Sequence, residues 1–531
     1  MDVRASGKGG WSKRRMTRRE ALGWLAVRAG AVVAGAAGVG TIAFLRPWAG
    51  PSETADDQGS APGHLVARPG LVAEDGVQVF RSRPDLRPPV VSVRVPPAAT
   101  ALPGYIMTDC HYGPGQQGPI ILDRDGGLVW FEPLSAHDTA RLRAFDLEVQ
   151  SYRDEPVLAY WRGRVVHGHG EGYYVLNDRS YRPIAEVHAQ GPYQGDLHEF
   201  VLTPEGTALF TCYGTASADL TALGGTSDGR YAYGVVQEVD VATGRLLFEW
   251  RSDEHVPFED SYVPIEANDP IPWDYFHVNS IGVDPSDGNL IVSGRNTWAF
   301  YKVERKTGTV LWRVGGKASD FAVPKEARFA FQHDVKPRPD HLVTIFDNEA
   351  GPPAEASQSR GLVLALDEID RTVRFVTQYH HTPPVLAYAE GNVQDLAEGH
   401  RFVGWGDAPD FTEFDGAGNV LFDAGFWPGT KLYRAFKQAW QGAPTTVPDI
   451  AVERSGNGAT VYVSWNGATA VAGWSVLGGA GASALRPVGR VARAGFETAI
   501  TLGTAPAYVA VEAIDAQGHV LARSRVGAVP G

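Results

Sequence analysis

The chain has 531 residues, 44% hydrophobic and 21% charged, which is ordinary for a soluble globular protein with several domains or one large closed β-architecture. Its 62 glycines and 36 prolines favour many turns and little helix. The formal net charge of −13 is uneven, because residues 1–46 are basic and the remaining body is strongly acidic. Such an acidic body would repel nucleic acid, so we do not expect a nucleic-acid partner.

Residues 1–48 are similar to a twin-arginine export signal. Arg18 and Arg19 precede an Ala- and Gly-rich apolar run from 29 to 45. The run barely reaches the length of a membrane span, and no Ala-x-Ala cleavage site follows it. We therefore expect an exported protein, either secreted or anchored at its amino terminus; a cytosolic basic tail is the alternative.

Residues 49–69 are polar, acidic and rich in Pro and Gly, and predict a disordered linker. From 70 to 440 short alternating segments separated by Gly, Asp, Asn and Pro predict strands, and only 139–147 suggests a helix. A degenerate hairpin recurs in which an acidic residue and Gly or Asn make a tight turn before an aromatic residue; its copies are 121–130, 238–250, 302–312 and 413–422, with a weaker copy at 364–375.

The spacing of these copies favours one four-stranded blade per copy, and hence an all-β fold with a β-propeller of about six blades as the catalytic domain over 70–440. A β-sandwich made of unrelated hairpins is the alternative. Residues 446–531 have fewer aromatic and charged residues and four period-two segments, which predict a small immunoglobulin- or fibronectin-like β-sandwich with a packing or spacer role.

Only two cysteines are present, Cys110 and Cys212. An exported protein would allow them to pair, but spacing alone leaves a disulfide and two buried thiols equally open.

The segment 273–280 and the following Ser-Gly-Arg hold the first candidate site. His277 and Asn279 are two apart on a predicted strand, so we expect both side chains on one face, with Arg295 one strand later. An imidazole, an amide and a guanidinium together suit an anionic ester.

Two further histidines lie at or beside predicted strand starts, His198 in Asp-Leu-His-Glu-Phe and His333 in Phe-Gln-His-Asp-Val. The innermost strands of a propeller face its channel, so these side chains could converge with His277. Three imidazoles suit zinc or copper, but no pair has local metal-ligand spacing and no carboxylate or cysteine completes the set. His167 and His169 are closely spaced but lie in a Gly-rich stretch that predicts a loop.

Covalent transfer of an anionic group is the other interpretation, with one neutral histidine attacking while cationic and amide donors hold the oxygens. Phosphoryl transfer would need magnesium ligands and a phosphate-binding Gly loop, and neither pattern is present in the sequence.

At this point the chain resembles a known family, the bacterial arylsulfate sulfotransferases, and more closely their arylsulfotransferase-like branch in actinobacteria and fungi. The resemblance covers 100–430 and is carried in order by the motifs Pro103-Gly-Tyr-Ile, 123–130, His198-Glu-Phe, 237–240, 273–280, Gln332-His-Asp334, Phe346-Asp-Asn348 and 391–394.

The resemblance implies a six-bladed propeller that moves a sulfuryl group from an aryl sulfate ester to a phenol through a sulfohistidine, with no nucleotide donor and no cofactor. Carried over by motif, His333 would be the nucleophile, with His198 the next candidate. His198 and His277 would be acid/base and binding residues, and Asn279 and Arg295 would clamp the sulfate.

Asn348 and Arg360 form a second polar patch that could orient substrate, although a satisfied turn and a surface charge explain them equally well. His380 and His381 precede two prolines and predict a structural corner. A phenyl ring needs aromatic side chains around it. Five residues could supply them, or could instead pack between blades: Tyr112, Trp161, Tyr275, Trp298 and Trp405.

Two other function classes stay open. One is an exported propeller that binds a ligand without catalysis, because a propeller by itself carries no activity. The other is a quinone- or metal-dependent propeller oxidoreductase.

Overall fold

A computed structural model describes residues 65–70, 72–134, 142–266, 269–350 and 356–530. Within these ranges the chain forms strands and short 3-10 helices, with no α-helix. None of the helices in the described ranges is long and apolar enough to cross a membrane. The predicted export segment 1–48 lies outside the described residues.

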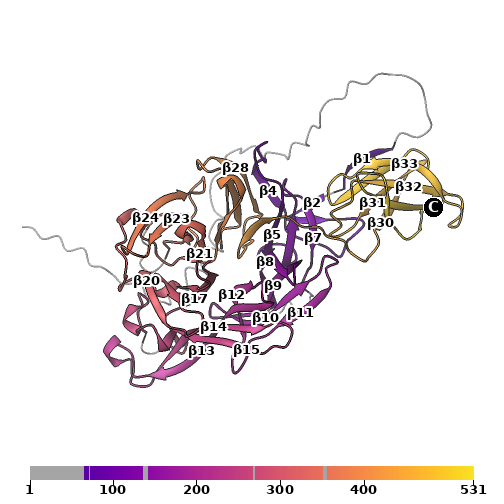
Figure 1. Cartoon of the computed structure of the whole chain (residues 1–531). Coiled ribbons are helices and arrows are strands. Elements are labelled where there is room, and N and C mark those ends of the chain that lie inside the picture. Colours follow the sequence, from indigo (N-terminus) through magenta and orange to yellow (C-terminus); the bar gives the residue numbers. More distant parts are fainter. Residues whose placement is uncertain (1–64, 71, 135–141, 267–268, 351–355, 531) are drawn as a thin grey trace, which may run out of the picture. The chain divides into compact units, whose positions relative to one another are not determined.

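Six four-stranded antiparallel units make up most of the fold (Figure 1). The first three units are β29 (Ala435–Gln438), β5 (Tyr105–Cys110), β6 (Gly118–Leu122) and β7 (Leu128–Phe131); β8 (Leu142–Tyr152), β9 (Glu155–Val166), β10 (His169–Asn177) and β11 (Pro183–Val187); and β12 (Gly195–Leu202), β13 (Thr207–Ala218), β14 (Gly229–Asp240) and β15 (Leu246–Arg251). The other three are β17 (Val278–Val283), β18 (Leu290–Gly294), β19 (Ala299–Val303) and β20 (Val310–Gly315); β21 (His333–Arg338), β22 (Leu342–Asp347), β23 (Arg360–Asp367) and β24 (Thr372–Tyr379); and β25 (Asn392–Asp395), β26 (Arg401–Gly404), β27 (Asp410–Phe414) and β28 (Val420–Phe426).

Smaller elements join these units. β4 (Val91–Val95) adds a fifth strand to the last unit, and β2 (Val72–Glu74) pairs with β3 (Val77–Val79). β16 (Trp273–Asp274) pairs in parallel with the start of β14. The 3-10 helices are η1 (Thr221–Leu223), η2 (Ser252–Glu254), η3 (Phe258–Asp260), η4 (Arg295–Thr297), η5 (Lys325–Ala327), η6 (Pro339–His341) and η7 (Ala397–Gly399).

The first strands of the six units form a closed ring. β8 contacts β12, then β12 contacts β17, β17 contacts β21, β21 contacts β25, β25 contacts β29, and β29 returns to β8. The chain closes the ring by pairing β29, from its later part, with β5. The predicted all-β fold with a six-bladed propeller is therefore confirmed.

The five copies of the recurring hairpin become the two outer strands of five blades: β6–β7, β14–β15, β19–β20, β23–β24 and β27–β28. In the first copy the Asp123 carboxylate accepts hydrogen bonds from the backbone N–H groups of Asp125 and Gly127. Gly126 between them has a φ of +80°, a conformation that favours glycine. In the four stronger copies an acidic residue and a glycine with positive φ occupy the turn, whereas the weaker copy 364–375 has no glycine.

Two further sheets are built from strands that follow the propeller in sequence, joined by one strand that precedes it. One contains β30 (Asp449–Ser455), β31 (Gly458–Ser464), β34 (Glu497–Leu502) and β1 (Val66–Pro69); the other contains β32 (Gly473–Gly479), β33 (Arg486–Ala492), β35 (Tyr508–Ile514), β36 (Val520–Arg523) and β37 (Gly527–Ala528). They share one hydrophobic core around Trp474. An immunoglobulin- or fibronectin-like sandwich stays a prediction for this part.

Three local expectations need correction. The end of the predicted linker 49–69 is a strand, because Val66 to Pro69 pair with β34. The predicted helix at 139–147 is a strand from Leu142 onward, since pairing with β9 overrides local propensity and Asp146 has a φ of +60°. Cys110 and Cys212 do not form the disulfide that was one expectation; both are buried free thiols.

Candidate active site

Three histidines meet at one end of three consecutive blades. His198 lies on β12, His277 immediately precedes β17, and His333 is the first residue of β21. Their exposed fractions are only 4%, 1% and 1%. The expected convergence across blades is therefore present, because these first strands are neighbours in the ring.

The expectation that His277 and Asn279 lie on one strand face is wrong. His277 has a φ of +56° and stands outside the strand, and the β17–β18 register shifts between Val278 and Ser280. The left-handed turn directs the His277 ring across to the neighbouring blade, where its Nε2 lies 3.2 Å from Nε2 of His198. Strand periodicity does not predict this contact.

Both rings of this pair are held by a carboxylate on the other nitrogen. Nδ1 of His198 lies 2.7 Å from Oδ2 of Asp196, and Nδ1 of His277 lies 2.5 Å from Oδ2 of Asp274. Each Nδ1 therefore donates its proton to a carboxylate, and each Nε2 carries a lone pair toward the other ring. A hydrogen bond between the two Nε2 atoms therefore needs a proton on one of them.

The protonation balance of the pair is set by burial and neighbouring charges. Burial, followed by the charge of Arg295, lowers the pKa of His277 well below its ordinary value. Burial acts against ionisation of Asp274, but the adjacent His277 and His169 rings reverse this and hold the pKa of its carboxyl well below the usual range. Asp274 is therefore an anion that accepts hydrogen bonds from the rings of His277 and His169.

A fourth histidine, His169, also belongs to the cluster, so its assignment to a loop was wrong. It is the first residue of β10; its ring stacks on Tyr213 at 3.7 Å and its Nε2 lies 3.0 Å from Oδ2 of Asp274. The glycine after it permits the close approach, because a Cβ on Gly170 would lie 2.4 Å from the backbone nitrogen of Leu197. The glycines around His169, from which a loop was predicted, instead allow close contact between neighbouring blades.

The same groups are the described residues that could hold a metal ion. Ligand atoms of His169, Asp274 and His277 all lie within 4.8 Å of one another. Asp274 supplies the carboxylate that the sequence motifs left unassigned. In the structure Oδ2 of Asp274 already accepts hydrogen bonds from both rings.

His333 is fixed in one tautomer. Asn348 donates from Nδ2 to the carbonyl oxygens of Ala387 and Glu390, at 3.1 Å each, so its Oδ1 must face His333. Nδ1 of His333 lies 2.7 Å from that oxygen and is therefore the donor. Nε2 of His333 consequently carries the lone pair, and it accepts the backbone N–H of Glu390 at 3.2 Å.

His333 is also kept neutral. Burial, with the charges of Arg295 and His198 adding to it, lowers the pKa of His333 well below its ordinary value. A neutral imidazole with an available Nε2 lone pair has the electronic state of a nucleophile. The ring centroid of His333 lies 6.3 Å from that of His198.

Arg295 lies beside the histidines at the start of η4. Its backbone N–H donates to the carbonyl of His277 at 3.0 Å, and its guanidinium carbon lies 5.6 Å from the Phe331 ring centroid. The charge of Arg295 lowers the pKa of both His277 and His333.

Asn279 and Arg360 have other contacts. Asn279 is fully buried and donates from Nδ2 to the carbonyl of Gln332 at 2.7 Å, which positions the backbone just before His333. Arg360 forms ion pairs with Asp347 at 3.0 Å and Glu349 at 3.1 Å. The structure therefore gathers His198, His277, His333, Arg295 and Asn348, and it adds His169, Asp196 and Asp274.

Comparison with known proteins decides the family. A family model described as arylsulfotransferase (ASST) matches residues 148–427, which is more than half of the chain. The chain belongs to the arylsulfotransferase family. The matched part of this family member contains all four clustered histidines, Arg295 and Asn348.

No curated protein matches this arylsulfotransferase-family chain significantly. Among solved structures, a protein of unknown function from Bacteroides caccae aligns with 12% identity and a TM-score of 0.39, covering 63% of this chain and 98% of the other. A catalytically inactive virginiamycin B lyase from Staphylococcus aureus with quinupristin aligns with 8% identity, TM-score 0.33 and coverage of 78% and 99%. The Dos1 propeller aligns with 12% identity, TM-score 0.27 and coverage of 74% and 75%.

Most of the expected aromatic walls of this arylsulfotransferase-family protein are packing residues. Trp161, Tyr275 and Trp405 are fully buried, and Trp298 stacks on Tyr262 at 3.8 Å. Tyr112 differs, because 52% of its surface is exposed. Among the five, Tyr112 is therefore the side chain available to a substrate ring.

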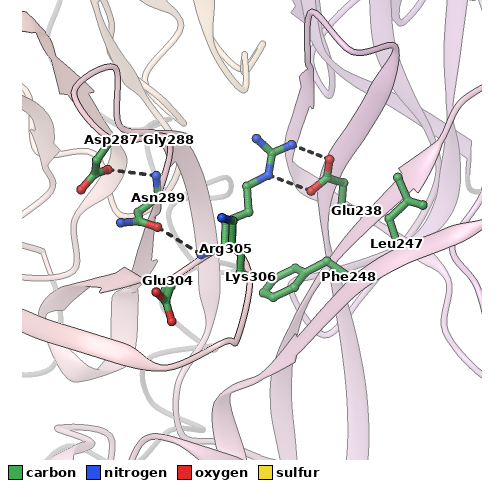
Figure 2. A pocket seen from close by; sticks show the side chains of 9 residues that line it. All are labelled: Glu238, Leu247, Phe248, Asp287, Gly288, Asn289, Glu304, Arg305 and Lys306. Atoms are coloured by element: carbon green, nitrogen blue, oxygen red, sulfur yellow. Dashed lines mark hydrogen bonds and ion pairs between the residues drawn. The ribbon is translucent and has the colours of Figure 1, made fainter.

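A surface hollow of about 670 Å³ lies elsewhere, between the third and fourth blades (Figure 2). Its lining includes the turns 287–289 and 304–306, which stand at the opposite end of the blade strands from His277 and Arg295. In it the guanidinium of Arg305 pairs with the carboxylate of Glu238 (Figure 2). This hollow is separate from the histidine cluster.

Proposed function

We propose that this protein is a sulfotransferase that moves a sulfuryl group from an aryl sulfate ester to a phenol, with His333 as the covalent carrier. The family match supports sulfotransferase activity in general. The observation that carries the finer proposal is the fixed tautomer of His333, in which Nδ1–H donates to Asn348 and the lone pair is on Nε2.

In the first half-reaction Nε2 of His333 attacks the sulfur, the S–Nε2 bond forms and the ester S–O bond breaks. The aryl oxygen leaves with the bonding electron pair. In the second half-reaction a phenolate oxygen attacks the same sulfur and the S–Nε2 bond breaks with its electron pair going to Nε2, which restores neutral His333. A phenol has a pKa near 10, so phenolate leaves and attacks more readily than an alkoxide.

Charge stabilisation comes from the groups around the nucleophile. The Arg295 guanidinium offsets the negative charge that builds on the sulfuryl oxygens, and the paired rings of His198 and His277 lie beside His333. Asp196 and Asp274 hold the two rings in place through their Nδ1 protons. Removing one such preorganised donor typically costs about 10²- to 10³-fold in rate.

The test is phenol release from a chromogenic aryl sulfate with and without a phenolic acceptor. The proposal expects acceptor-dependent turnover by the wild type and turnover at background for His333→Ala. Absence of turnover across varied donors and acceptors, with a ligand still bound, would instead favour the non-catalytic binding propeller.

We also propose that the protein is exported, secreted or tethered by its amino terminus. Support comes from the paired Arg18 and Arg19 and the apolar run after them. Fusing residues 1–48 to a reporter should direct it out of the cytoplasm, and an Arg18→Lys, Arg19→Lys double variant should retain it. Equal export of both fusions would contradict the proposal.

A further inference from the structure

A second, partly buried acid/base group, Glu390, lies beside His333. The backbone N–H of Glu390 donates to Nε2 of His333, and its carboxylate Oε1 lies 3.7 Å from Nε2 of His111. His111 in turn places Nδ1 2.7 Å from Oδ2 of Asp109. Three ionisable groups thus follow one another toward the proposed nucleophile: Asp109, His111 and Glu390, of which Glu390 contacts His333 through its backbone.

Glu390 is held in an unusual backbone conformation. Its φ is +68°, its N–H is used by His333 and its carbonyl oxygen by Asn348. Its buried Oε2 has no hydrogen-bond partner among the described residues. A buried carboxyl oxygen without a partner in a protein interior generally serves a ligand, a water or a proton.

The surroundings of Glu390 bring the pKa of its carboxyl close to neutral pH. Burial raises the pKa of Glu390 to about 7, with His111 and Lys431 opposing and Asp407 and Asp109 adding to the rise. Burial also lowers the pKa of His111 to about 4, so that ring is neutral near pH 7. Arg143 is the further cation that faces His111.

Aromatic surface lies next to the same group. Tyr112 and Tyr388 are 52% and 51% exposed, although both are large side chains. The Tyr112 ring meets His111 edge-on at 5.3 Å, and the guanidinium carbon of Arg143 lies 5.1 Å from the Tyr112 centroid. This aromatic surface could stack on an aryl ring, and the Arg143 cation beside it would favour an anionic ester.

We propose that the Glu390 carboxyl, backed by His111 and Asp109, is a proton-transfer site for the phenols of the reaction. This assignment rests on the proposed function. When the aryl oxygen leaves, protonated Glu390 gives it a proton, producing a neutral phenol and a carboxylate. When the acceptor phenol attacks, the carboxylate takes that phenol's proton, so one proton cycles and no other reagent is consumed.

The test compares two donors in the half-reaction without acceptor: phenyl sulfate, whose phenolate needs a proton, and nitrophenyl sulfate, whose phenolate is stable near neutral pH. Glu390→Gln should slow adduct formation from phenyl sulfate by about 10²-fold, the usual contribution of a general acid. It should leave the nitrophenyl reaction within about threefold.

Glu349→Gln is the matched control. Glu349 follows Asn348, has a φ of +52° and pairs with Arg360 instead of a histidine. It should retain the wild-type ratio of the two rates. In the wild type itself, the rate with phenyl sulfate should fall as the pH rises through about 7. The rate with nitrophenyl sulfate should not fall over this pH range.

The outcomes separate the two claims. The role of Glu390 would be overturned if Glu390→Gln kept the wild-type ratio of the phenyl sulfate rate to the nitrophenyl sulfate rate. It would also be overturned if both rates fell in the same way above pH about 7. Either result would leave sulfuryl transfer intact. No adduct from either donor in the wild type would overturn the proposed function and this assignment together.

Discussion

Replacement of Asn348 by alanine tests how the nucleophile is prepared. The side chain accepts the Nδ1 proton of His333 at 2.7 Å and donates to two carbonyl oxygens at 3.1 Å. Without it the reactive tautomer would keep a buried Nδ1–H with no acceptor, at a cost of about 1–3 kcal/mol. At about 1.4 kcal/mol per tenfold, that lowers the population of the reactive state by about 5- to 150-fold.

The assay is single-turnover phenol release, with thermal unfolding measured in parallel. Asn348→Ala should lower the rate of sulfuryl transfer by this factor and change the KM for donor little, because the group acts through His333. Asn392→Ala is the matched control. Asn392 is equally buried and exchanges two hydrogen bonds of 2.9 Å with the backbone of Ala435.

Both variants should lose stability, but only Asn348→Ala should lose rate in the fraction that stays folded. Equal rate losses in the two variants, or a wild-type rate in Asn348→Ala, would refute the argument that Asn348 fixes the tautomer.

Further predictions follow from the other contacts. Asp274→Asn should reduce turnover about 10²- to 10³-fold with the protein still folded, since it removes the anion that holds the His277 ring; a wild-type rate would exclude a role for this carboxylate. Because the pKa of His277 and His333 is lowered in the fold, the unfolded chain takes up more protons as the pH falls below about 6.5. The free energy of unfolding should therefore decrease in acid, by up to about 1.4 kcal/mol per pH unit for each histidine, and His333→Gln should flatten this slope. Dithiothreitol should leave the unfolding temperature unchanged because both cysteines are free; a lower temperature would indicate a disulfide.

The propeller could be predicted because its signal is local and repeated. Four of the five recurring hairpins contain an acidic side chain and a glycine with positive φ at the turn, as at Asp123 and Gly126. Closure of the ring by β29 and β5 joins residues far apart in sequence, and no local pattern specifies that pairing.

The candidate site could be predicted only in part. His198, His277 and His333 stood out by their motifs, but the pairing of His277 with His198 depends on a left-handed turn that strand periodicity conceals. His169 was missed because its neighbouring glycines resemble a loop. The disulfide question also needed the fold, because Cys110 and Cys212 lie on strands of different blades.

The partners of the nucleophile were the least predictable part. Asn348 and Glu390 reach His333 from separate segments, one at the end of β22 and one before β25. Their roles arise from hydrogen-bond direction, which sequence does not contain.

The central claim is that His333 carries the sulfuryl group, and the most direct test is mass spectrometry of the protein quenched during reaction with an aryl sulfate in the absence of acceptor. The account predicts one acid-labile sulfuryl group on the peptide containing His333, removed by added phenol and absent from His333→Ala. A sulfuryl group on His198 or on another residue, or turnover with no covalent adduct, would contradict it.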